Sequence, residues 1–300
     1  DANEKLTEEA VAKKLNGNKA QIIIGELADD ITEKVELLVI SPGVPVDSPL
    51  VKKFEEAGVP VWGEIELAYN YDKGRIIAIT GTNGKTTTTA LVGQIVKAYN
   101  EQTYVVGNIG NSYTGEVLKT SENSYTVAEI SSFQLETVHR FHPVVSAILN
   151  ITPDHLNRHH TMECYAHTKE RIAENQTKDD VCVLNMEDEE LYRFGSECKA
   201  SVVWFSSKRK PDKGAYLDGD DIRYTDGTQD KLMLNIHDMN LLGTHNYENV
   251  CAAIAMTKAV GIPDDIIIEQ VKCFKAVEHR IEYVATKKGV WYYNDSKGTN

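Results

Sequence analysis

The stretch AITGTNGKTTTTALV, residues 78–92, contains the strongest structural signal in the chain. It continues an apolar run, RIIAIT (75–80), which is typical of a buried strand, and it leads into TTTTALVGQIVKAY (86–99), which is typical of a helix. Gly81 and Gly84 lie between the two and permit a tight turn whose backbone N–H groups can surround an anion. The stretch therefore predicts a phosphate-binding loop between a strand and a helix.

The residue types around the second glycine indicate what this loop would bind. Lys85 would reach the β- and γ-phosphates of a nucleotide, and the hydroxyl of Thr86 would bind Mg²⁺. The standard pattern G-x-x-x-x-G-K-[ST] is not met, because Ile79 occupies the position of its first glycine. The shorter TGTNGKTT still has both glycines that the turn needs. We expect the nucleotide to be bound by Gly81, Thr82, Asn83, Gly84, Lys85, Thr86 and Thr87.

The composition is typical of a soluble globular protein with two or three domains, because 300 residues exceed one ordinary core. The formal net charge of −13 argues against a general nucleic-acid binder, which would have a basic face. The five cysteines form no CxxC pair, which predicts reduced thiols and no structural zinc site. No apolar run is long enough to cross a membrane, so we expect no membrane partner.

Short apolar runs alternate with helix-like segments along most of the chain. Repeated strand–helix–strand units predict an α/β fold with a mostly parallel sheet covered by helices. Residues 214–237 differ, because they alternate around Asp-Gly turns and predict hairpins. We predict strands at 21–26, 35–41, 59–62, 75–80, 103–107, 124–130, 144–150, 181–185 and 201–206, and helices at 7–15, 48–58, 86–99 and 246–261.

Three more candidate residues follow other predicted strands. Glu129 lies at the C-terminal end of a strand, where open α/β sheets bind ligands, and a carboxylate there can bind Mg²⁺. His155 lies in a loop just past the next strand, and Lys169 lies on the helix after that loop. Taken alone, Glu129 favours a metal ligand over a helix cap, whereas Lys169 is more typical of a surface lysine. The histidines of this segment do not predict zinc, because no second ligand cluster has structural-site spacing.

Five motifs occur in the order, and at roughly the spacings, of the Mur ligases, which add amino acids to the peptidoglycan precursor. The chain resembles this family over nearly its whole length. SPGVP (41–45), ISSFQLE and NDSKGTN resemble the members that add D-glutamate to UDP-N-acetylmuramoyl-L-alanine. The five motifs are TGTNGKTT, AEISSFQLE, ITPDHLNRHHTMECYAHTKERI, GTHNYENVCAA and VEHRIEYV…YNDSKGTN.

The resemblance implies three domains. Residues 1–72 would be part of an N-terminal, Rossmann-like domain that binds the UDP substrate. Residues 73–276 would be the central ATPase domain with its P-loop-type sheet, and residues 277–300 would begin a Rossmann-like C-terminal domain that binds the amino acid. The first strand of the family fold and most of the third domain have no counterpart here. We therefore expect the chain to be a piece of a longer enzyme, truncated at both ends.

The resemblance also implies a reaction. In the family, the carboxylate of the muramoyl substrate attacks the γ-phosphate of ATP, and the amine of the amino acid attacks the resulting acyl phosphate. Two anions must approach each other, so positive charge has to be concentrated between them, and Lys85 with two Mg²⁺ ions would supply it. Thr86 and Glu129 match ligands of the first Mg²⁺, and His155 matches a ligand of the second. Lys169 matches a lysine that CO₂ converts to a carbamate, which can support a cation.

The remaining site residues are implied by motif position alone. Asn108 and His155 match contacts to the UDP-sugar substrate, and Asn246 and Asn249 match contacts to the adenine and ribose side of the nucleotide. The C-terminal motif adds Arg280 and Asp295 as nucleotide contacts, and Lys297 and Thr299 as contacts near the phosphate and the incoming D-glutamate. We expect a cytoplasmic monomer that acts on these small molecules.

Other functions stay open at this point. A sibling ligase that adds another amino acid, or a ligase like folylpolyglutamate synthase, would share the phosphate loop and the lysine. A nucleotide-binding module without turnover would bind ATP but release no phosphate in response to substrate. A P-loop kinase has less support, because the sequence has no separate lid or acceptor signature.

Overall fold

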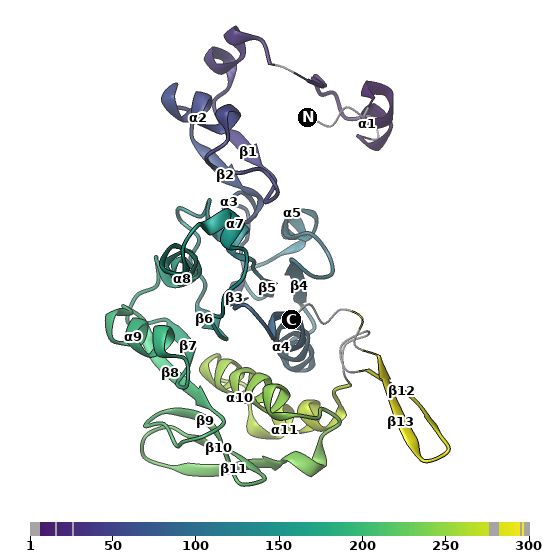
Figure 1. Cartoon of the computed structure of the whole chain (residues 1–300), viewed down its shortest axis with the longest axis vertical. Helices are drawn as coiled ribbons and strands as arrows, with labels where there is room; N and C mark the ends of the chain where they lie inside the picture. Colours follow the sequence, from purple (N-terminus) through teal and green to yellow (C-terminus); the bar gives the residue numbers. More distant parts are fainter. Residues whose placement is uncertain (1–6, 16, 26, 276–281, 295, 297–300) are drawn as a thin grey trace. The chain divides into compact units, whose positions relative to one another are not determined.

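The computed structural model describes residues 7–15, 17–25, 27–275, 282–294 and 296 of the 300-residue chain. The chain divides into two compact units, one formed by residues 1–40 and 44–61 and the other by residues 41–43 and 62–300 (Figure 1). The continuous part of the second unit begins at Trp62, whereas the resemblance placed a domain boundary after residue 72. The division into three domains stays a prediction.

The first unit is small. Its helix α2 begins as the sequence predicted, because the Ser48 hydroxyl accepts a hydrogen bond from the Val51 N–H and Pro49 occupies the first turn. The strand predicted at 21–26 is wrong, since residues 21–25 form none. An apolar run becomes a strand only when a second strand satisfies its backbone groups. The elements of residues 8–63 are α1 (Glu8–Lys14), η1 (Asp29–Lys34), β1 (Leu38–Ile40), α2 (Pro49–Glu56) and β2 (Val61–Gly63), and β2, of which only Val61 belongs to the first unit, pairs with β1.

The second unit is built on a nine-stranded sheet with the order β11-β10-β9-β8-β7-β6-β3-β5-β4. Pairing is parallel from β4 to β9, and β9, β10 and β11 are antiparallel, as predicted for residues 214–237. The strands are β3 (Arg75–Thr80), β4 (Thr103–Gly107), β5 (Tyr125–Glu129), β6 (Val145–Ile148), β7 (Val181–Asn185), β8 (Ser201–Ser206), β9 (Gly214–Asp218), β10 (Asp221–Thr225) and β11 (Asp230–Asn235).

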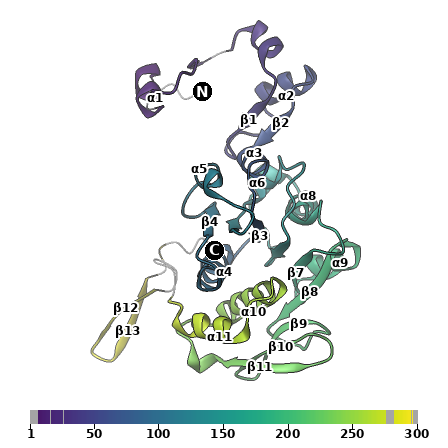
Figure 2. The same ribbon diagram turned by 180° about the vertical axis from the view of Figure 1, so that it is seen from behind.

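Helices cover the parallel part of the sheet on both faces. Ile77 and Ile79 of β3 pack into a core with α4, α10 and α11, while Ile76 and Ala78 pack into a second core with α3, α5, α8 and α9 (Figures 1 and 2). Successive side chains of a strand point to opposite faces, so β3 is apolar throughout because both faces are covered. The α/β class is confirmed.

The helices of the second unit are short except for α4 and α10. They are α3 (Glu64–Tyr69), α4 (Lys85–Tyr99), α5 (Tyr113–Glu116), η2 (Val117–Lys119), α6 (Ser132–Leu135), α7 (Leu156–His159), α8 (Met162–Glu170), η3 (Arg171–Ala173), α9 (Glu189–Glu197), η4 (Ile236–Asp238), α10 (Thr244–Ala259) and α11 (Asp264–Cys273). A final hairpin consists of β12 (Glu282–Lys287) and β13 (Val290–Asn294). Within the described residues, no helix is long and apolar enough to cross a bilayer.

Candidate functional site

The turn between β3 and α4 has no room for side chains at its two glycines. Gly84 precedes α4 with a φ of 82°, and a Cβ placed there would lie 2.3 Å from Oδ1 of Asn249 on α10. Gly81 has a φ of 151°, and its Cβ would lie 3.0 Å from Cβ of Leu149, just past β6. Both positions therefore need glycine for conformation and for space. The loop is enclosed between the end of β6 and the start of α10.

Residues that follow β6 fix the loop from one side. The backbone N–H groups of Thr82 and Asn83 donate to the backbone oxygen and to Oδ1 of Asn150, at 2.9 and 2.7 Å. The Thr82 hydroxyl lies 3.1 Å from the Tyr165 hydroxyl on α8. The loop leads directly into α4, and the N–H groups in the first turn of a helix are the donors that an anion would meet.

Two lysines from distant parts of the chain share one carbonyl oxygen. Nζ of Lys85 donates to the carbonyl of Gly81 at 2.8 Å and to that of Thr82 at 2.7 Å. Nζ of Lys169, whose residue is only 1% exposed, donates to the same Gly81 carbonyl at 2.9 Å. The ammonium of Lys169 also lies 4.6 Å from the ring centre of Tyr165. The residue predicted on the helix after the His155 loop therefore lies directly at the phosphate loop.

This burial changes the acid–base chemistry of Lys169. Desolvation lowers the pKa of Lys169 well below its usual value, and the nearby charge of Lys85 lowers it further, while Asp154 opposes the shift. A lysine in such a site is stabilised as the neutral amine, which is the form that reacts with an electrophile. The surface-lysine interpretation of Lys169 is wrong, because its side chain is enclosed.

Glu129 ends β5 next to the phosphate loop and is 2% exposed. Its Oε1 accepts a hydrogen bond from Nδ2 of Asn108 at 2.8 Å, and its Oε2 has no hydrogen-bond partner among the described residues. The Thr80 hydroxyl at the end of β3 is likewise buried without a described partner. A buried carboxylate oxygen without a donor is costly, and a bound cation would remove that cost. The donor set at this edge therefore fits a hard cation such as Mg²⁺.

His155 and His159 lie four residues apart but in different environments. His155 is exposed, has a left-handed φ of 52°, and places its ring 4.9 Å from the ring of Phe133. His159 is buried, with Nε2 2.9 Å from the Ser132 hydroxyl, and burial lowers its pKa. His155 is thus the histidine that a ligand can reach. Among all the described residues, no group of three His, Cys, Asp or Glu side chains lies close enough together to hold a metal ion by itself.

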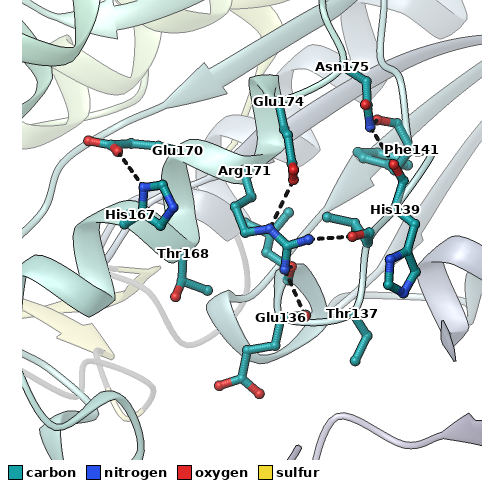
Figure 3. A network of polar contacts seen from close by, with 12 residues as sticks. Glu136, Thr137, His139, Phe141, His167, Thr168, Glu170, Arg171, Glu174 and Asn175 are labelled. Atoms are coloured by element: carbon teal, nitrogen blue, oxygen red, sulfur yellow. Dashed lines mark hydrogen bonds and ion pairs between the residues drawn. The ribbon is translucent and has the colours of Figure 1, made fainter. Parts of the chain in front are cut away.

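An arginine joins the helix that carries Lys169 to the segment that follows Glu129 (Figure 3). The Arg171 guanidinium donates to the carbonyls of Leu135 and Glu136 at 2.9 and 2.7 Å, and also to that of Val138. It forms an ion pair with Glu174 at 2.9 Å as well. Because four acceptors surround one planar group, the two segments are held in a fixed relation.

A second link is the ion pair between Arg158, on α7, and Glu136. Nε of Arg158 lies 3.1 and 3.2 Å from the two carboxylate oxygens, and the side chains are only 13% and 10% exposed. The sequence patterns predicted neither this pair nor the role of Arg171. Tyr165 was also missed, although its position four residues before Lys169 would place both on one face of a helix.

The residues predicted on the adenine side lie at the start of α10. Asn246 and Asn249 are buried, and Nδ2 of Asn246 donates to the carbonyl of Leu242 at 2.8 Å. Asn249 lies against Gly84, so α10 contributes directly to the wall of the loop. Asn108 bonds to Glu129, a contact that motif position did not predict. The other predicted residues, Arg280, Asp295, Lys297 and Thr299, lie outside the described residues.

Comparisons with known sequences point in one direction. Residues 79–257 match the model of the Mur ligase middle domain. The UDP-N-acetylmuramoylalanine–D-glutamate ligase of Lachnospira eligens is 79% identical over all 300 residues, which span 67% of that protein. The enzyme of the same name from Lachnoclostridium phytofermentans is 52% identical, again over the whole chain and 66% of its own length. The chain thus spans about two thirds of the length of these relatives.

Solved structures agree on the fold. The UDP-N-acetylmuramate-alanine ligase of Thermotoga maritima is 21% identical and has a TM-score of 0.59, with 98% of this chain and 67% of that chain covered. A UDP-N-acetylmuramoyl-L-alanyl-D-glutamate–2,6-diaminopimelate ligase is 19% identical and has a TM-score of 0.62, with 86% and 64% covered. At these identities the likeness concerns the fold alone.

Proposed function

Because this chain belongs to the Mur ligase family, we propose that it contains the ATP-binding core of a ligase that joins D-glutamate to UDP-N-acetylmuramoyl-L-alanine. The identity of 79% to a relative with that name supports the choice of amino acid. The observation that carries the chemistry is the pair of lysines on the Gly81 carbonyl. Lys85 supplies a cation beside the glycine turn, where anions would meet, and Lys169 supplies a buried amine that is favoured in its neutral, reactive form.

The reaction would proceed in two steps. The alanyl carboxylate of the muramoyl substrate attacks the γ-phosphorus of ATP, which gives an acyl phosphate and ADP. The amine of D-glutamate then attacks the acyl carbon, an amide forms, and inorganic phosphate leaves. In this scheme Lys85 leaves the loop carbonyls to neutralise the transferred phosphoryl group, while the N–H groups at the start of α4 bind the phosphates.

The acidic edge of the site would hold Mg²⁺. We assign Glu129 and Thr86 to one cation and His155, with Glu129 shared, to a second; bound Mg²⁺ supplies positive charge to the phosphates. The unpartnered Oε2 of Glu129 supports this assignment. Lys169 would take up CO₂ as its neutral amine, and the resulting carbamate would give this buried side chain an anionic oxygen that can support a cation.

Asn108 and His155 would contact the UDP-sugar substrate, and Asn246 and Asn249 the nucleoside. We assign Arg280 and Asp295 to the nucleotide, and Lys297 and Thr299 to the region of the phosphate and the incoming amino acid. We further propose that the enzyme acts as a monomer in the cytoplasm, where ATP and UDP-sugars are found.

The decisive experiment measures phosphate release by the full-length protein with ATP, Mg²⁺ and UDP-N-acetylmuramoyl-L-alanine across a panel of amino acids. We expect release to be stimulated by D-glutamate alone. Stimulation by another amino acid would overturn the substrate and point to a sibling ligase. If no substrate stimulates release, the ligase proposal is wrong and a nucleotide-binding module remains.

Carbamylation of Lys169 has its own test. Native mass spectrometry of protein equilibrated with bicarbonate should show the added mass of one CO₂, which Lys169→Arg should abolish. The matched variant Lys199→Arg, at a more exposed lysine, should retain it. Wild-type protein without the added mass in bicarbonate and Mg²⁺ would contradict the assignment.

A further inference from the structure

Helix α7, which directly follows His155, is too short to keep its place by its own backbone hydrogen bonds. It consists of residues Leu156–His159, and a helix of this length is not stable by itself in water. His155 before it and His160 after it both have positive φ values, 52° and 65°. Such conformations are unfavourable for residues other than glycine and persist where surrounding contacts impose them. The direction of the His155 side chain therefore depends on contacts that α7 makes with other segments.

His159, the last residue of α7, makes such contacts with α6. Its side chain is only 1% exposed, and its Nε2 lies 2.9 Å from the hydroxyl of Ser132, the first residue of α6. The centre of its ring lies 5.6 Å from that of Phe133. Ser132 comes three residues after Glu129 along the chain. His159 thus joins the helix that follows His155 to the segment that follows Glu129.

The same imidazole packs against α8, the helix that carries Lys169. The centre of the His159 ring lies 5.1 Å from that of Tyr165, and the two ring planes are inclined by 44°. The Tyr165 hydroxyl lies 3.1 Å from the Thr82 hydroxyl in the phosphate loop, and its ring centre lies 4.6 Å from the ammonium of Lys169. Tyr165 and Lys169 are each 1% exposed. Because protein interiors are closely packed, a shift of the imidazole would be passed on to both side chains.

We propose that His159 is a positioning residue that fixes His155 and Lys169 relative to each other. One buried imidazole belongs to the helix after His155, contacts the segment after Glu129, and packs against the tyrosine beside Lys169. This inference rests on the proposed function, in which these three residues support the two cations. Removal of the ring would leave a cavity that its neighbours fill only partly. The His155 side chain would then adopt other directions, and Tyr165 would lose a ring that packs against it.

The first measurement counts the divalent cations that the full-length protein binds. Mn²⁺ replaces Mg²⁺ as the probe, because both prefer oxygen ligands, and electron paramagnetic resonance gives the free Mn²⁺ in bicarbonate buffer with a non-hydrolysable ATP analogue. Wild-type protein should bind two ions. His159→Ala should bind one of them about tenfold more weakly, because the direction of the His155 ligand is lost. The control His160→Asn, at an exposed neighbour whose positive φ asparagine tolerates, should bind both ions like wild type.

The second measurement follows CO₂ uptake by Lys169 in the absence of metal, by native mass spectrometry in bicarbonate. His159→Ala should lose most of the uptake, because Tyr165 no longer has a ring packed against it. His159→Phe keeps a ring beside Tyr165 but cannot bond to the Ser132 hydroxyl. This variant should take up CO₂ like wild type and still bind the second Mn²⁺ more weakly. A general loss of stability would not produce such a separation of the two measurements.

The outcomes distinguish this inference from the proposed function. If wild-type protein binds two ions and takes up CO₂, and His159→Ala does both equally well, the positioning role is wrong and the proposed function stands. If wild-type protein binds only one ion or takes up no CO₂, the cation assignment of the proposed function fails, and the inference fails with it. Circular dichroism checks that each variant is folded. If His159→Ala does not fold, His159→Phe decides, and wild-type behaviour of this variant in both measurements would overturn the proposal.

Discussion

Two carboxylates in the second unit each accept three hydrogen bonds. The carboxylate of Glu66 lies inside the protein, and that of Asp230 lies at the antiparallel end of the sheet. Glu66 on α3 is fully buried and accepts the backbone N–H groups of His139, Arg140 and Phe141 at 2.9, 2.9 and 3.2 Å. Asp230 at the start of β11 has a side chain that is 26% exposed. Its partners are the side chains of Lys210, Tyr216 and Arg223, at 2.5, 2.6 and 3.0 Å.

The difference teaches that the donors, rather than the number of bonds, decide what a carboxylate contributes to stability. The Glu66 carboxylate is fully buried, so its removal takes a charged acceptor from three backbone N–H groups at once and leaves a gap in the interior. The lysine and arginine beside Asp230 are long and flexible, and they find water when their partner is lost. We therefore expect similar hydrogen-bond lists to have very different energies.

The largest effect is expected at Glu66. Glu66→Ala should lower the free energy of unfolding by about 3–5 kcal/mol, because three backbone N–H groups lose a buried, charged acceptor. Urea unfolding of the full-length protein measures it. The control Glu122→Ala, at an exposed glutamate, should change the value by less than about 0.5 kcal/mol. An equal decrease in the free energy of unfolding in both variants would contradict the idea that the donors around Glu66 make it important for stability.

Arg171 tests whether the same rule holds for a cation with backbone partners. Arg171→Ala should cost about 2–4 kcal/mol, since three carbonyls lose a charged donor. Arg171→Lys should restore only part of this, because one ammonium cannot reproduce the planar arrangement of donors. Thermal unfolding and urea titration measure both variants. Full restoration by lysine would show that charge alone matters at this position.

Two ion pairs sharpen the comparison further, because they differ mainly in exposure. The Arg158–Glu136 side chains are 13% and 10% exposed, whereas those of Arg193–Glu190 are 53% and 50% exposed. Double-mutant cycles with alanine should give a coupling of about 1–3 kcal/mol for the first pair and below about 0.5 kcal/mol for the second. Similar coupling energies for the two ion pairs would mean that burial does not decide how much an ion pair contributes to stability.

The smallest effect is expected at Asp230. Asp230→Asn should move the unfolding temperature by less than about 2 °C at neutral pH, because the network is solvent-exposed. Its hydrogen bonds lower the pKa of Asp230 in the folded protein to about 2. The stabilisation by Asp230 is therefore complete at pH values above the pKa of an aspartate in the unfolded chain, about 3.9, and is lost as the pH falls through the pKa of the folded state. Thermal unfolding from neutral pH into this acidic window should show the two proteins converging. A difference that grows on acidification would contradict the sign.

Sequence patterns predicted the strands of the second unit well. The strands at 103–107, 181–185 and 201–206 match the structure residue for residue, because each is an apolar, β-branched run that has at least one partner strand in the sheet. The run at 21–26 has the same composition, yet its described residues form no strand. Composition reports the tendency of a segment, whereas pairing depends on strands elsewhere in the chain.

The residues of the candidate site likewise fall into those that the sequence could predict and those that it could not. The phosphate loop could be predicted because its functional groups are contiguous in residues 81–87. Its partners could not, since the Lys169–Gly81 contact spans 88 residues and the Asn108–Glu129 contact joins the ends of two strands. Side-chain contacts such as the Arg158–Glu136 ion pair depend on how separate segments pack together, which no local pattern encodes.

The position of β3 in the sheet has a consequence for how the protein is made. β3 is the first strand of the nine along the chain, yet it lies between β5 and β6, which a ribosome synthesises later. Until those strands emerge, the nascent chain exposes an apolar strand with both edges unpaired, which favours aggregation or capture by a chaperone. Nucleotide-binding competence should therefore arise late in translation, after the helix that carries Lys169 has left the ribosome.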